Sequence, residues 1–329
     1  MTAEIAEAVR LLTAGELVGI PTETVYGLGA DAANPDAVAK IFAAKGRPAD
    51  HPLIVHIPGA AHLDRWAREV PGVAWELAEA FWPGPLTLIL KRAANVPDAV
   101  TGGQDTVGLR VPGHPVALEL LREFAAAGGS GGIAAPSANR FGRISPTTAD
   151  HVREELGDSV PLVLDGGPCV VGIESTILDL SSGKPVLLRP GHISPAAIES
   201  VCGMQPEAPS GGVPRASGTL EAHYAPQTPM RLVSGERLLN FLNAMRHSGR
   251  RCGVLCHSQP PQVVSGPTPP HVWKMLPADP TGYAHDLYAA LRDLDHAGTE
   301  LIVVEAIPVT PAWNAVADRL RRAVTGAGA

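Results

Sequence analysis

Several widespread features are scarce or missing in this sequence of 329 residues. Aromatic residues make up 4% of the chain, so a hydrophobic core must be mainly aliphatic. The phosphate loop ending in Gly-Lys-Ser or Gly-Lys-Thr and the zinc-binding His-Glu-x-x-His pattern are absent, which argues against the commonest nucleotide hydrolases and zinc proteases. No apolar stretch approaches the ~20 residues of a membrane span, and no basic-then-apolar leader is present, so we expect neither a membrane segment nor a signal peptide.

Cysteine and net charge also narrow the class of protein. The four cysteines, Cys169, Cys202, Cys252 and Cys256, form no Cys-x-x-Cys pair and show no metal-ligand spacing with histidine. We therefore expect reduced, buried thiols in a cytoplasmic protein and no metal site built from protein ligands. The formal charge of −7 argues against a broad nucleic-acid footprint, although a local basic pocket remains compatible with it.

The length of the chain suggests about two domains on a prior of roughly 100–200 residues each. Residues 207–228 are rich in proline, glycine and serine, which is typical of a linker. Strand and helix patterns restart after this segment. We predict a catalytic domain over residues 1–206, a linker or lid over 207–228, and a smaller α/β domain over 229–329.

Residues 20–57 concentrate polar side chains beside short apolar runs. The runs at residues 17–20 and 53–57 predict two buried strands. Between them, Asn34 can cap a helix whose first turn accepts Pro35. The ends of such strands are where α/β proteins carry their chemistry. The polar residues at these expected ends are Thr22, Glu23, Thr24, Lys45, Arg47, His51 and His56.

Helical and strand patterns alternate through the rest of the larger domain. Several turns between neighbouring strands are too short for a crossover helix, so a wholly parallel sheet is excluded. We therefore predict an α/β fold with a twisted mixed sheet and a central cleft. Within that sheet, strand alternation places Thr106, Gly108 and Arg110 on one face.

Glycines 27 and 29 leave one alternative open. The segment Gly27-Leu-Gly29-Ala-Asp-Ala32 formally matches the dinucleotide-binding pattern Gly-x-Gly-x-x-Ala. The match is short, and the next strand ends without the expected acidic residue. A dinucleotide-dependent oxidoreductase is therefore a weak rival interpretation.

A scattered set of cationic and hydroxyl residues suggests a polyanion site. Arginine and lysine form charge-assisted bonds to phosphate or carboxylate, and hydroxyls orient the same oxygens. Taken singly, such residues usually cap turns and helices. Their recurrence at successive strand ends favours a binding role. The set comprises Lys45, Arg47, Arg110, Arg189, Thr22, Thr24, Thr106, Ser137, Asn139, Ser145 and Ser175.

The order of these motifs resembles that of the threonylcarbamoyl-AMP synthase family with its YrdC-like domain. The matching segments are Pro21-Thr-Glu-Thr-Val-Tyr-Gly-Leu-Gly29, Lys45-x-Arg47, Pro52-Leu-Ile-Val-His56, Trp82-Pro-Gly-Pro-Leu-Thr87, Arg110-x-Pro112, Pro136-Ser-Ala-Asn139, Glu174-Ser-Thr176 and Leu188-Arg-Pro-Gly191. His223-Tyr224-Ala-Pro226 resembles the linker of longer members, which carry a second, Rossmann-like α/β domain. Two departures are His51, where asparagine is usual, and Ser217-Gly-Thr219, which replaces Pro-Gly-Met.

The resemblance implies that L-threonine, bicarbonate and ATP, accompanied by Mg²⁺, give threonylcarbamoyl-AMP and pyrophosphate. The product serves threonylcarbamoyladenosine modification of tRNA next to the anticodon, which a separate tRNA threonylcarbamoyl transferase completes. No tightly bound cofactor is implied. A second rival, suggested by some YrdC-like domains, is an RNA-binding module, and weak binding of double-stranded RNA or tRNA is compatible with the synthase as well.

The resemblance also implies residue roles by matched position. The residues implied for L-threonine are Thr24, His56, Arg110, Ala135 and Ser175. The residues implied for ATP are Arg47, His51, Thr106, Ser137, Asn139, Ser145, Arg189 and Tyr224. Lys45 and Arg47 are the implied catalytic pair, with Lys45 neutralising phosphate.

Overall fold

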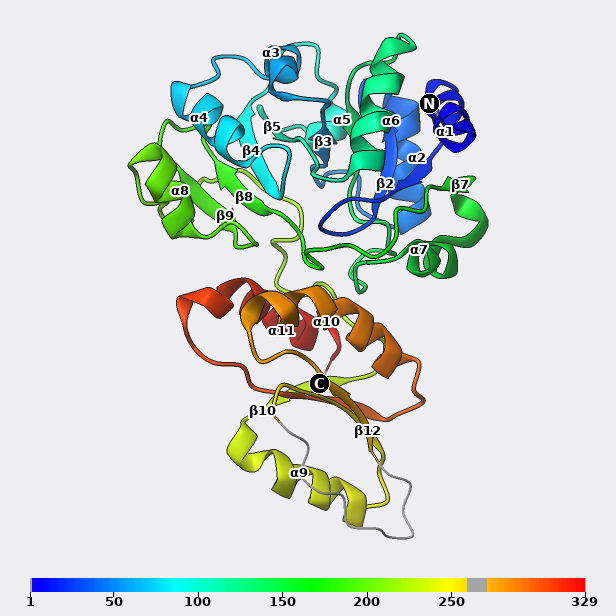
Figure 1. Cartoon of the computed structure of the whole chain (residues 1–329), viewed down its shortest axis with the longest axis vertical. Coiled ribbons are helices and arrows are strands. Elements are labelled where there is room, and N and C mark those ends of the chain that lie inside the picture. The colour runs from blue at the N-terminus through cyan, green and yellow to red at the C-terminus, as the bar shows by residue number, and fades with distance from the viewer. Residues whose placement is uncertain (1, 259–270, 329) are drawn as a thin grey trace. The chain divides into compact units, whose positions relative to one another are not determined.

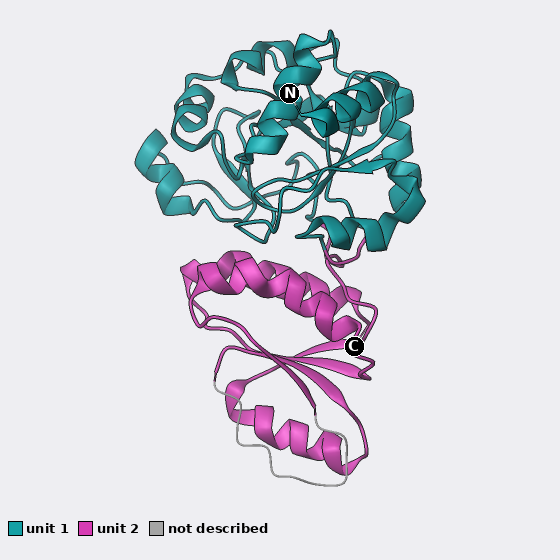
Figure 2. Cartoon of the chain, turned by 45° about the vertical axis from the view of Figure 1, so that its right-hand side comes forward, with its two compact units in different colours: residues 1–141, 145–219 teal, residues 142–144, 220–329 magenta. Residues whose placement is uncertain are grey.

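The computed structural model describes residues 2–258 and 271–328 and divides them into two compact units. Unit 1 contains residues 1–141 and 145–219, and unit 2 contains residues 142–144 and 220–329 (Figure 2). Across the described part of the chain, no helix combines the length and apolar character needed to span a membrane.

Unit 1 is built on a nine-stranded mixed sheet (Figure 1). Its strands are β1 (Val18–Ile20), β2 (Gly27–Asp31), β3 (Ile54–His56), β4 (Leu86–Lys91), β5 (Thr106–Arg110), β6 (Ile133–Ala134), β7 (Leu162–Val163), β8 (Thr176–Asp179) and β9 (Val186–Arg189). Their spatial order is β7-β1-β2-β6-β3-β5-β4-β8-β9, and only the pairs β1·β7, β3·β5 and β4·β8 are parallel. The expected mixed α/β sheet is therefore confirmed.

The helices of unit 1 begin mostly at residues that can cap them. They are α1 (Ala3–Thr13), α2 (Pro35–Lys45), α3 (Leu63–Trp66), α4 (Gly72–Phe81), α5 (Asp98–Thr101), α6 (Pro115–Ala126), α7 (Ala149–Leu156) and α8 (Pro195–Cys202), with short 3-10 turns at Ala60–His62 and Gly157–Ser159. The Asn34 side chain accepts the backbone N–H groups of Asp36 and Ala37, as expected for the cap of α2. Gly46 ends that helix with φ of 62°, a conformation that glycine adopts without steric cost.

The region between β1 and α2 differs from the sequence interpretation. A strand-helix-strand unit was expected there, but β2 intervenes and pairs antiparallel with β1. Gly27 and Gly29 therefore lie within a strand and not in a turn that opens a helix, which removes the dinucleotide-binding interpretation. Close packing explains the second glycine, because a Cβ at Gly29 would lie 2.3 Å from Ile20 Cδ1.

Aliphatic side chains fill two core clusters in unit 1. The larger cluster contains Val38 and Ile41 of α2 together with Leu28 of β2. The other contains Leu12 of α1 and Phe124 of α6 with buried residues of β1. Residues 21–26 connect β1 to β2 and carry the polar motif.

Unit 2 has a four-stranded, wholly parallel sheet in the order β10-β13-β11-β12. Its elements are β10 (Met230–Val233), α9 (Gly235–His247), β11 (Cys252–Cys256), β12 (Val272–Met275), α10 (Pro280–Asp295), β13 (Leu301–Glu305), a 3-10 turn at Pro311–Trp313, and α11 (Asn314–Gly326). Figure 1 shows α10 and α11 on one face of this sheet and α9 on the other. The second α/β domain is therefore confirmed, although β12 was not expected from the sequence.

Candidate functional site

Three neighbouring strands bring three of the expected site residues together. His56 and Arg110 are register partners on the parallel strands β3 and β5. His56 is also the register partner of Ile133 on β6, and Ala135 follows β6 directly. His56 and Arg110 thus lie beside each other at the ends of β3 and β5, and Ala135, whose N–H donates to the Ile54 carbonyl at 3.0 Å, lies two residues back along β3.

The Arg110 guanidinium is fixed by the loop between β1 and β2. Its Nη2 atom donates to Thr24 Oγ1 at 2.9 Å and lies 2.7 Å from Glu23 Oε1. Its Nε donates to the Gly84 carbonyl at 3.3 Å. The side chains of Arg110 and Glu23 are only 5% and 8% exposed, so this is a buried charge pair that depends on both partners.

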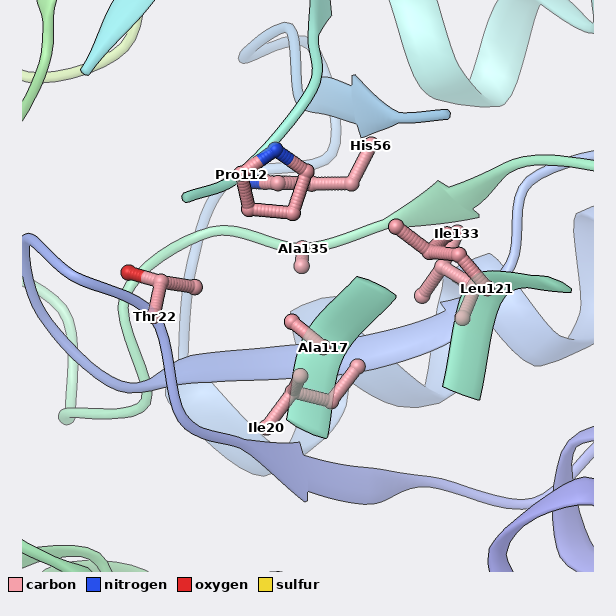
Figure 3. A pocket seen from close by; sticks show the side chains of 8 residues that line it. All are labelled: Ile20, Thr22, His56, Pro112, Ala117, Leu121, Ile133 and Ala135. Carbon is pink, nitrogen blue, oxygen red and sulfur yellow. The ribbon is translucent and has the colours of Figure 1, made fainter. Parts of the chain in front are cut away.

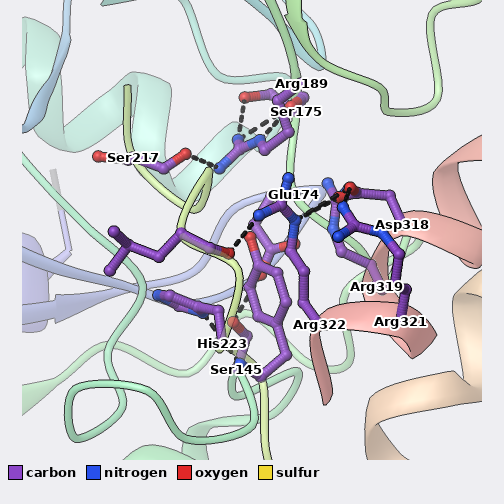
Figure 4. Close-up of polar contacts among 12 residues, drawn as sticks. Ser145, Glu174, Ser175, Arg189, Ser217, His223, Asp318, Arg319, Arg321 and Arg322 are labelled. Atoms are coloured by element: carbon purple, nitrogen blue, oxygen red, sulfur yellow. Dashed lines mark hydrogen bonds and ion pairs between the residues drawn. The ribbon is translucent and has the colours of Figure 1, made fainter. Parts of the chain in front are cut away.

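Ser175 and Arg189 form a second polar centre at the β8–β9 end of the sheet. The Ser175 hydroxyl shares a 2.8 Å hydrogen bond with the Thr87 hydroxyl. Arg189 Nη2 donates to the carbonyl and the hydroxyl of Ser175 at 2.9 and 3.1 Å (Figure 4). Because Thr87 lies on β4 and Ser175 precedes β8, the contact joins two parallel neighbours.

Ser217 lies against two of the arginines expected to bind ATP. Its hydroxyl accepts from Arg47 at 3.3 Å and donates to the Pro52 carbonyl at 2.8 Å. Its carbonyl accepts from Arg189 at 2.8 Å. Thr106 begins β5 at the end near Pro52, because Ile54 is the register partner of Gly108. Arg47, Arg189 and Ser217 therefore meet within unit 1.

Lys45 ties the end of α2 to the loop after β6. Its ammonium group donates to the carbonyls of Ser137 and Asn139 at 2.6 and 2.5 Å. The side chain is buried, and burial, reinforced by the charge of Arg47, holds the pKa of Lys45 well below its usual value. Lys45 thus fixes the backbone of two residues expected to contact ATP.

The remaining residues expected to bind ATP lie in different surroundings. The Ser145 hydroxyl donates to Glu174 Oε1 at 2.6 Å within unit 1. The His51 ring lies edge-on to Phe141, with 5.4 Å between ring centroids. Burial, followed by the charge of Arg47, lowers the pKa of His51.

Tyr224 belongs to unit 2 and is held by aromatic and cationic neighbours there. Its ring lies 4.2 Å from the His223 ring and 5.7 Å from the Tyr288 ring, and the Arg319 guanidinium carbon is 5.5 Å from its centroid. Its φ of 62° is uncommon for a residue with a side chain. In the same unit, Asp318 accepts from Arg322 at 2.9 Å (Figure 4).

A small pocket opens beside His56 and Ala135. The pocket is partly open to solvent, and its lining is mostly aliphatic. Figure 3 labels the lining residues, which are Ile20, Thr22, His56, Pro112, Ala117, Leu121, Ile133 and Ala135. Burial, followed by the charge of Arg110, lowers the pKa of His56 to about 3, so its ring is neutral at physiological pH.

Several residues that the structure places here have no specific role predicted from the sequence. Thr87 and Ser217 were part of quoted segments, and Glu23 was noted only for its position. Glu174 was visible beside Ser175 but carried no assignment. These residues are identified by their contacts with residues that are distant in the sequence, and such contacts cannot be inferred from spacing along the chain.

The fold and these polar centres define an α/β protein with a YrdC-like mixed sheet and a second, Rossmann-like unit. The Sua5/YciO/YrdC family model, described as "Telomere recombination", matches residues 10–191, and a model described as "Threonylcarbamoyl-AMP synthase, C-terminal domain" matches residues 193–325. The chain belongs to the threonylcarbamoyl-AMP synthase family.

Individual relatives agree with these matches. A threonylcarbamoyl-AMP synthase from Bacillus subtilis is 41% identical, and the alignment covers 98% of this chain and 93% of the relative. A putative threonylcarbamoyl-AMP synthase from Mycobacterium tuberculosis is 42% identical over 61% of this chain and 89% of its own length. The crystal structure of P. abyssi Sua5 complexed with L-threonine is similar with a TM-score of 0.88 and 38% identity, covering 98% of this chain and 94% of that one.

Proposed function

We propose that this chain catalyses the formation of threonylcarbamoyl-AMP and pyrophosphate from L-threonine, bicarbonate and ATP. The observation that carries the proposal, beside family membership, is the arrangement around β5. Arg110 ends this strand beside His56 and the pocket, whereas Thr106 begins it on the side of Arg47 and Ser217. One strand thus connects a site suited to an amino acid with a site suited to phosphates.

The threonine side combines charge, hydroxyls and an apolar wall. Arg110 is proposed to pair with the carboxylate of threonine, and the neutral His56 ring to contact its side chain. Ala135 contributes a small apolar surface to the pocket. The full proposed set is Thr24, His56, Arg110, Ala135 and Ser175, of which Ser175 also contacts Arg189 of the proposed ATP side.

The ATP side is proposed to contain Arg47, His51, Thr106, Ser137, Asn139, Ser145, Arg189 and Tyr224, with Lys45 and Arg47 as the catalytic pair. Tyr224 is included on the resemblance of its motif alone. Mg²⁺ would accompany ATP and be held mainly by phosphate oxygens and water, since this ion retains its water readily. Among the described residues, no group of three or more His, Cys, Asp or Glu side chains is placed to hold a metal ion.

The chemistry depends on positioning and charge and requires no protein nucleophile. The threonine amine combines with bicarbonate to give a carbamate, whose oxygen then attacks the α-phosphate as pyrophosphate leaves. Both reactants are anionic, so cationic side chains must offset their repulsion while the substrates are aligned. The arginines on both sides of β5 are suited to that role.

The product is proposed to pass to a tRNA threonylcarbamoyl transferase in the cytoplasm, where the reducing environment suits the four free cysteines. Direct contact with tRNA or double-stranded RNA would be weak, because the net charge of −7 opposes it.

The test is pyrophosphate release by the full chain with ATP and Mg²⁺. Pyrophosphate release should require both threonine and bicarbonate. In Arg110→Ala, low concentrations of threonine should no longer stimulate pyrophosphate release. Pyrophosphate release that is unchanged when either threonine or bicarbonate is omitted would contradict the proposal.

A further inference from the structure

The Glu23 carboxylate is buried beside Arg110 and has no role in the binding scheme above. Its Oε1 atom lies 2.7 Å from Arg110 Nη2. Apart from this ion pair, neither carboxylate oxygen has a hydrogen-bond partner among the described residues. Buried acceptors normally have partners, so the carboxylate is suited to a donor that a ligand supplies.

The surrounding backbone holds this carboxylate in place. The Thr22 hydroxyl accepts the N–H of Val25 at 3.2 Å, and the Val171 N–H donates to the Glu23 carbonyl at 2.8 Å. A Cβ added at Gly113 would lie 3.3 Å from Glu23 Cδ and 3.4 Å from Oε1. Glycine at position 113 therefore leaves the space that the carboxyl group occupies.

The apolar pocket is lined by neighbours of the charge pair. Thr22 precedes Glu23 in the chain, Pro112 lies two residues after Arg110, and His56 is the register partner of Arg110. A cation and an anion are therefore each next to residues that line an apolar surface. The same three features, with the charges reversed, make up an amino-acid zwitterion: a carboxylate for Arg110, an ammonium for Glu23 and a side chain for the pocket.

We propose that Glu23 binds the α-ammonium group of L-threonine and accepts its proton. This inference rests on the proposed function, because it takes Arg110 as the partner of the threonine carboxylate. An ammonium group has no lone pair, whereas the attack on bicarbonate requires one. Glu23 is thereby a catalytic residue, since it contacts the reacting nitrogen.

The step balances in atoms and charge. An N–H bond of the ammonium breaks, its electron pair stays on nitrogen, and the proton moves to a Glu23 oxygen. The nitrogen then bonds to the bicarbonate carbon while a C–O bond breaks, and the departing oxygen leaves as water with a second proton from nitrogen. The carbamate keeps the negative charge of bicarbonate. Glu23 returns its proton to solvent after the product leaves.

The groups that face Glu23 are compatible with this role. Arg110 on β5 supplies the positive charge, and its register partner His56 is neutral because its pKa is lowered to about 3. Burial raises the pKa of the Cys169 thiol to about 12, and the charge of Glu23 adds to this shift. Cys169 is therefore protonated and adds no second anion.

The decisive variant is Glu23→Gln in the full chain, which keeps the shape of the side chain and removes its charge. We expect kcat/KM for threonine to fall by about 10²–10⁴-fold, the usual contribution of a general base. The α-ammonium of free threonine stays mostly protonated in water up to about pH 8, so the residual rate should rise about tenfold per pH unit from pH 6 to 8. The pH dependence of the wild type should be shallower.

Ligand binding separates a catalytic role from support of Arg110 alone. The probe is 2,3-dihydroxybutyrate, which has the threonine carboxylate and side chain but no ammonium. Glu23→Gln should weaken threonine binding at least tenfold and leave binding of the probe unchanged or tighter. ATP affinity and the melting temperature report whether the fold is intact.

Matched variants sharpen the test. Glu16→Gln removes a carboxylate that is 42% exposed and should behave as the wild type. Gly113→Ala crowds the Glu23 carboxyl and should reduce kcat with the same steeper pH dependence, to a smaller extent. Glu23→Asp should recover part of the rate lost in Glu23→Gln and restore the wild-type pH profile.

Two results would overturn the proposal: a Glu23→Gln rate and pH profile equal to those of the wild type, or equal weakening of threonine and 2,3-dihydroxybutyrate. The second result would make Glu23 only a support for Arg110. Failure of the proposed function itself would appear differently, as a wild-type protein without pyrophosphate release that depends on threonine and bicarbonate.

Discussion

Arg110 and Arg189 both lie at strand ends and both donate to serine or threonine hydroxyls, yet their other neighbours differ. Arg110 faces the buried carboxylate of Glu23 at 2.7 Å. Arg189 meets the Ser217 carbonyl, and Ser217 also contacts Arg47 through its hydroxyl. One centre therefore contains a fixed negative charge, whereas the other is in contact with a neutral serine.

This difference determines which kind of ligand each centre can bind. A ligand that approaches Arg110 must accommodate Glu23, so a ligand carrying both charges is favoured over a simple anion. A phosphate that approaches Arg47 and Arg189 meets Ser217, whose hydroxyl and carbonyl accept from these two arginines, and charge-assisted bonds to phosphate are stronger than those to neutral oxygens. The two centres should therefore respond to mutation through different ligands.

Arg110→Ala is the strongest test of this division. The expected loss of threonine affinity is roughly thirty-fold to several thousand-fold, because removing one partner of a buried charge pair costs about 2–5 kcal/mol. ATP affinity should change less than about threefold. Isothermal titration with each ligand separately measures both values, and comparable losses for the two ligands would remove the distinction.

Arg47→Ala should show the opposite pattern with a somewhat smaller effect. Arg47 donates to the Pro52 carbonyl and to the Ser217 hydroxyl. When Arg47 is removed, the hydrogen bond from Ser217 to the Pro52 carbonyl can remain, so the local fold should be kept. We expect ATP affinity to fall by roughly tens-fold and threonine affinity to remain close to wild type. Arg68→Ala, at an exposed ion pair with Asp105, is the control for loss of an arginine.

Ala135→Val probes the apolar wall beside the Arg110 centre. One methyl group in an apolar pocket is worth about 1–3 kcal/mol, so the wild type should prefer threonine to serine by roughly ten- to a few-hundred-fold. Valine should occupy the space of the threonine methyl and reduce this preference about tenfold. Relative kcat/KM values for the two amino acids give the answer, and an unchanged ratio would show that Ala135 is not the wall.

Tyr224→Ala tests whether the ATP centre also requires residues from outside unit 1. If Tyr224 covers the nucleotide, the variant should bind ATP several-fold more weakly and hydrolyse more ATP per threonylcarbamoyl-AMP recovered, because water is excluded less well. The matched variant Tyr224→Phe separates the hydroxyl from the ring. Unaltered ATP affinity and product yield in Tyr224→Ala would indicate that this tyrosine only anchors the chain.

The smallest expected effect concerns His56 and stability. The pKa of His56 is lowered to about 3 when folded, whereas an unfolded histidine binds a proton below about pH 6.5. The unfolded state therefore holds more protons between these values, and stability is lost as pH falls from 6.5. His56 should contribute at most about 1.4 kcal/mol per pH unit. Urea unfolding at pH 7, 6 and 5 of wild type and His56→Asn isolates this slope, and equal slopes would contradict it.

Local signals made part of the fold predictable from the sequence. The cap at Asn34, Pro35 in the first turn and Gly46 at the end define α2 through short-range contacts. By contrast, β2 was missed because two glycines in five residues resemble a turn. Both glycines are explained by close neighbours: a Cβ at Gly29 would meet the Ile20 side chain of the neighbouring strand, and a Cβ at Gly27 would lie 3.1 Å from Ala135 Cβ. A propensity scale contains no information about such a neighbour.

The candidate site was likewise only partly predictable from the sequence. Arg110 was placed on the correct strand face by simple alternation, but its pairing with Glu23 crosses 87 positions of the chain and depends on how a loop folds back. Lys45 was expected near phosphate, whereas its described bonds go to carbonyls 92 and 94 residues away. Sequence spacing indicates residue types at strand ends, and only the folded chain shows which of them satisfy one another.

Strand β5 sets the distance between Thr106 and Arg110. Thr106 and Arg110 lie on one face of it, four residues apart, which is about 13 Å at roughly 3.3 Å per residue. This length is set by peptide bonds and by pairing with β3 and β4 on both sides, so no side-chain substitution can change it. Insertion or deletion of one residue within β5 would turn every later side chain of the strand to the opposite face. Substitutions at either end of β5 therefore change the side chains there and leave the distance between the proposed threonine and ATP sides unaltered.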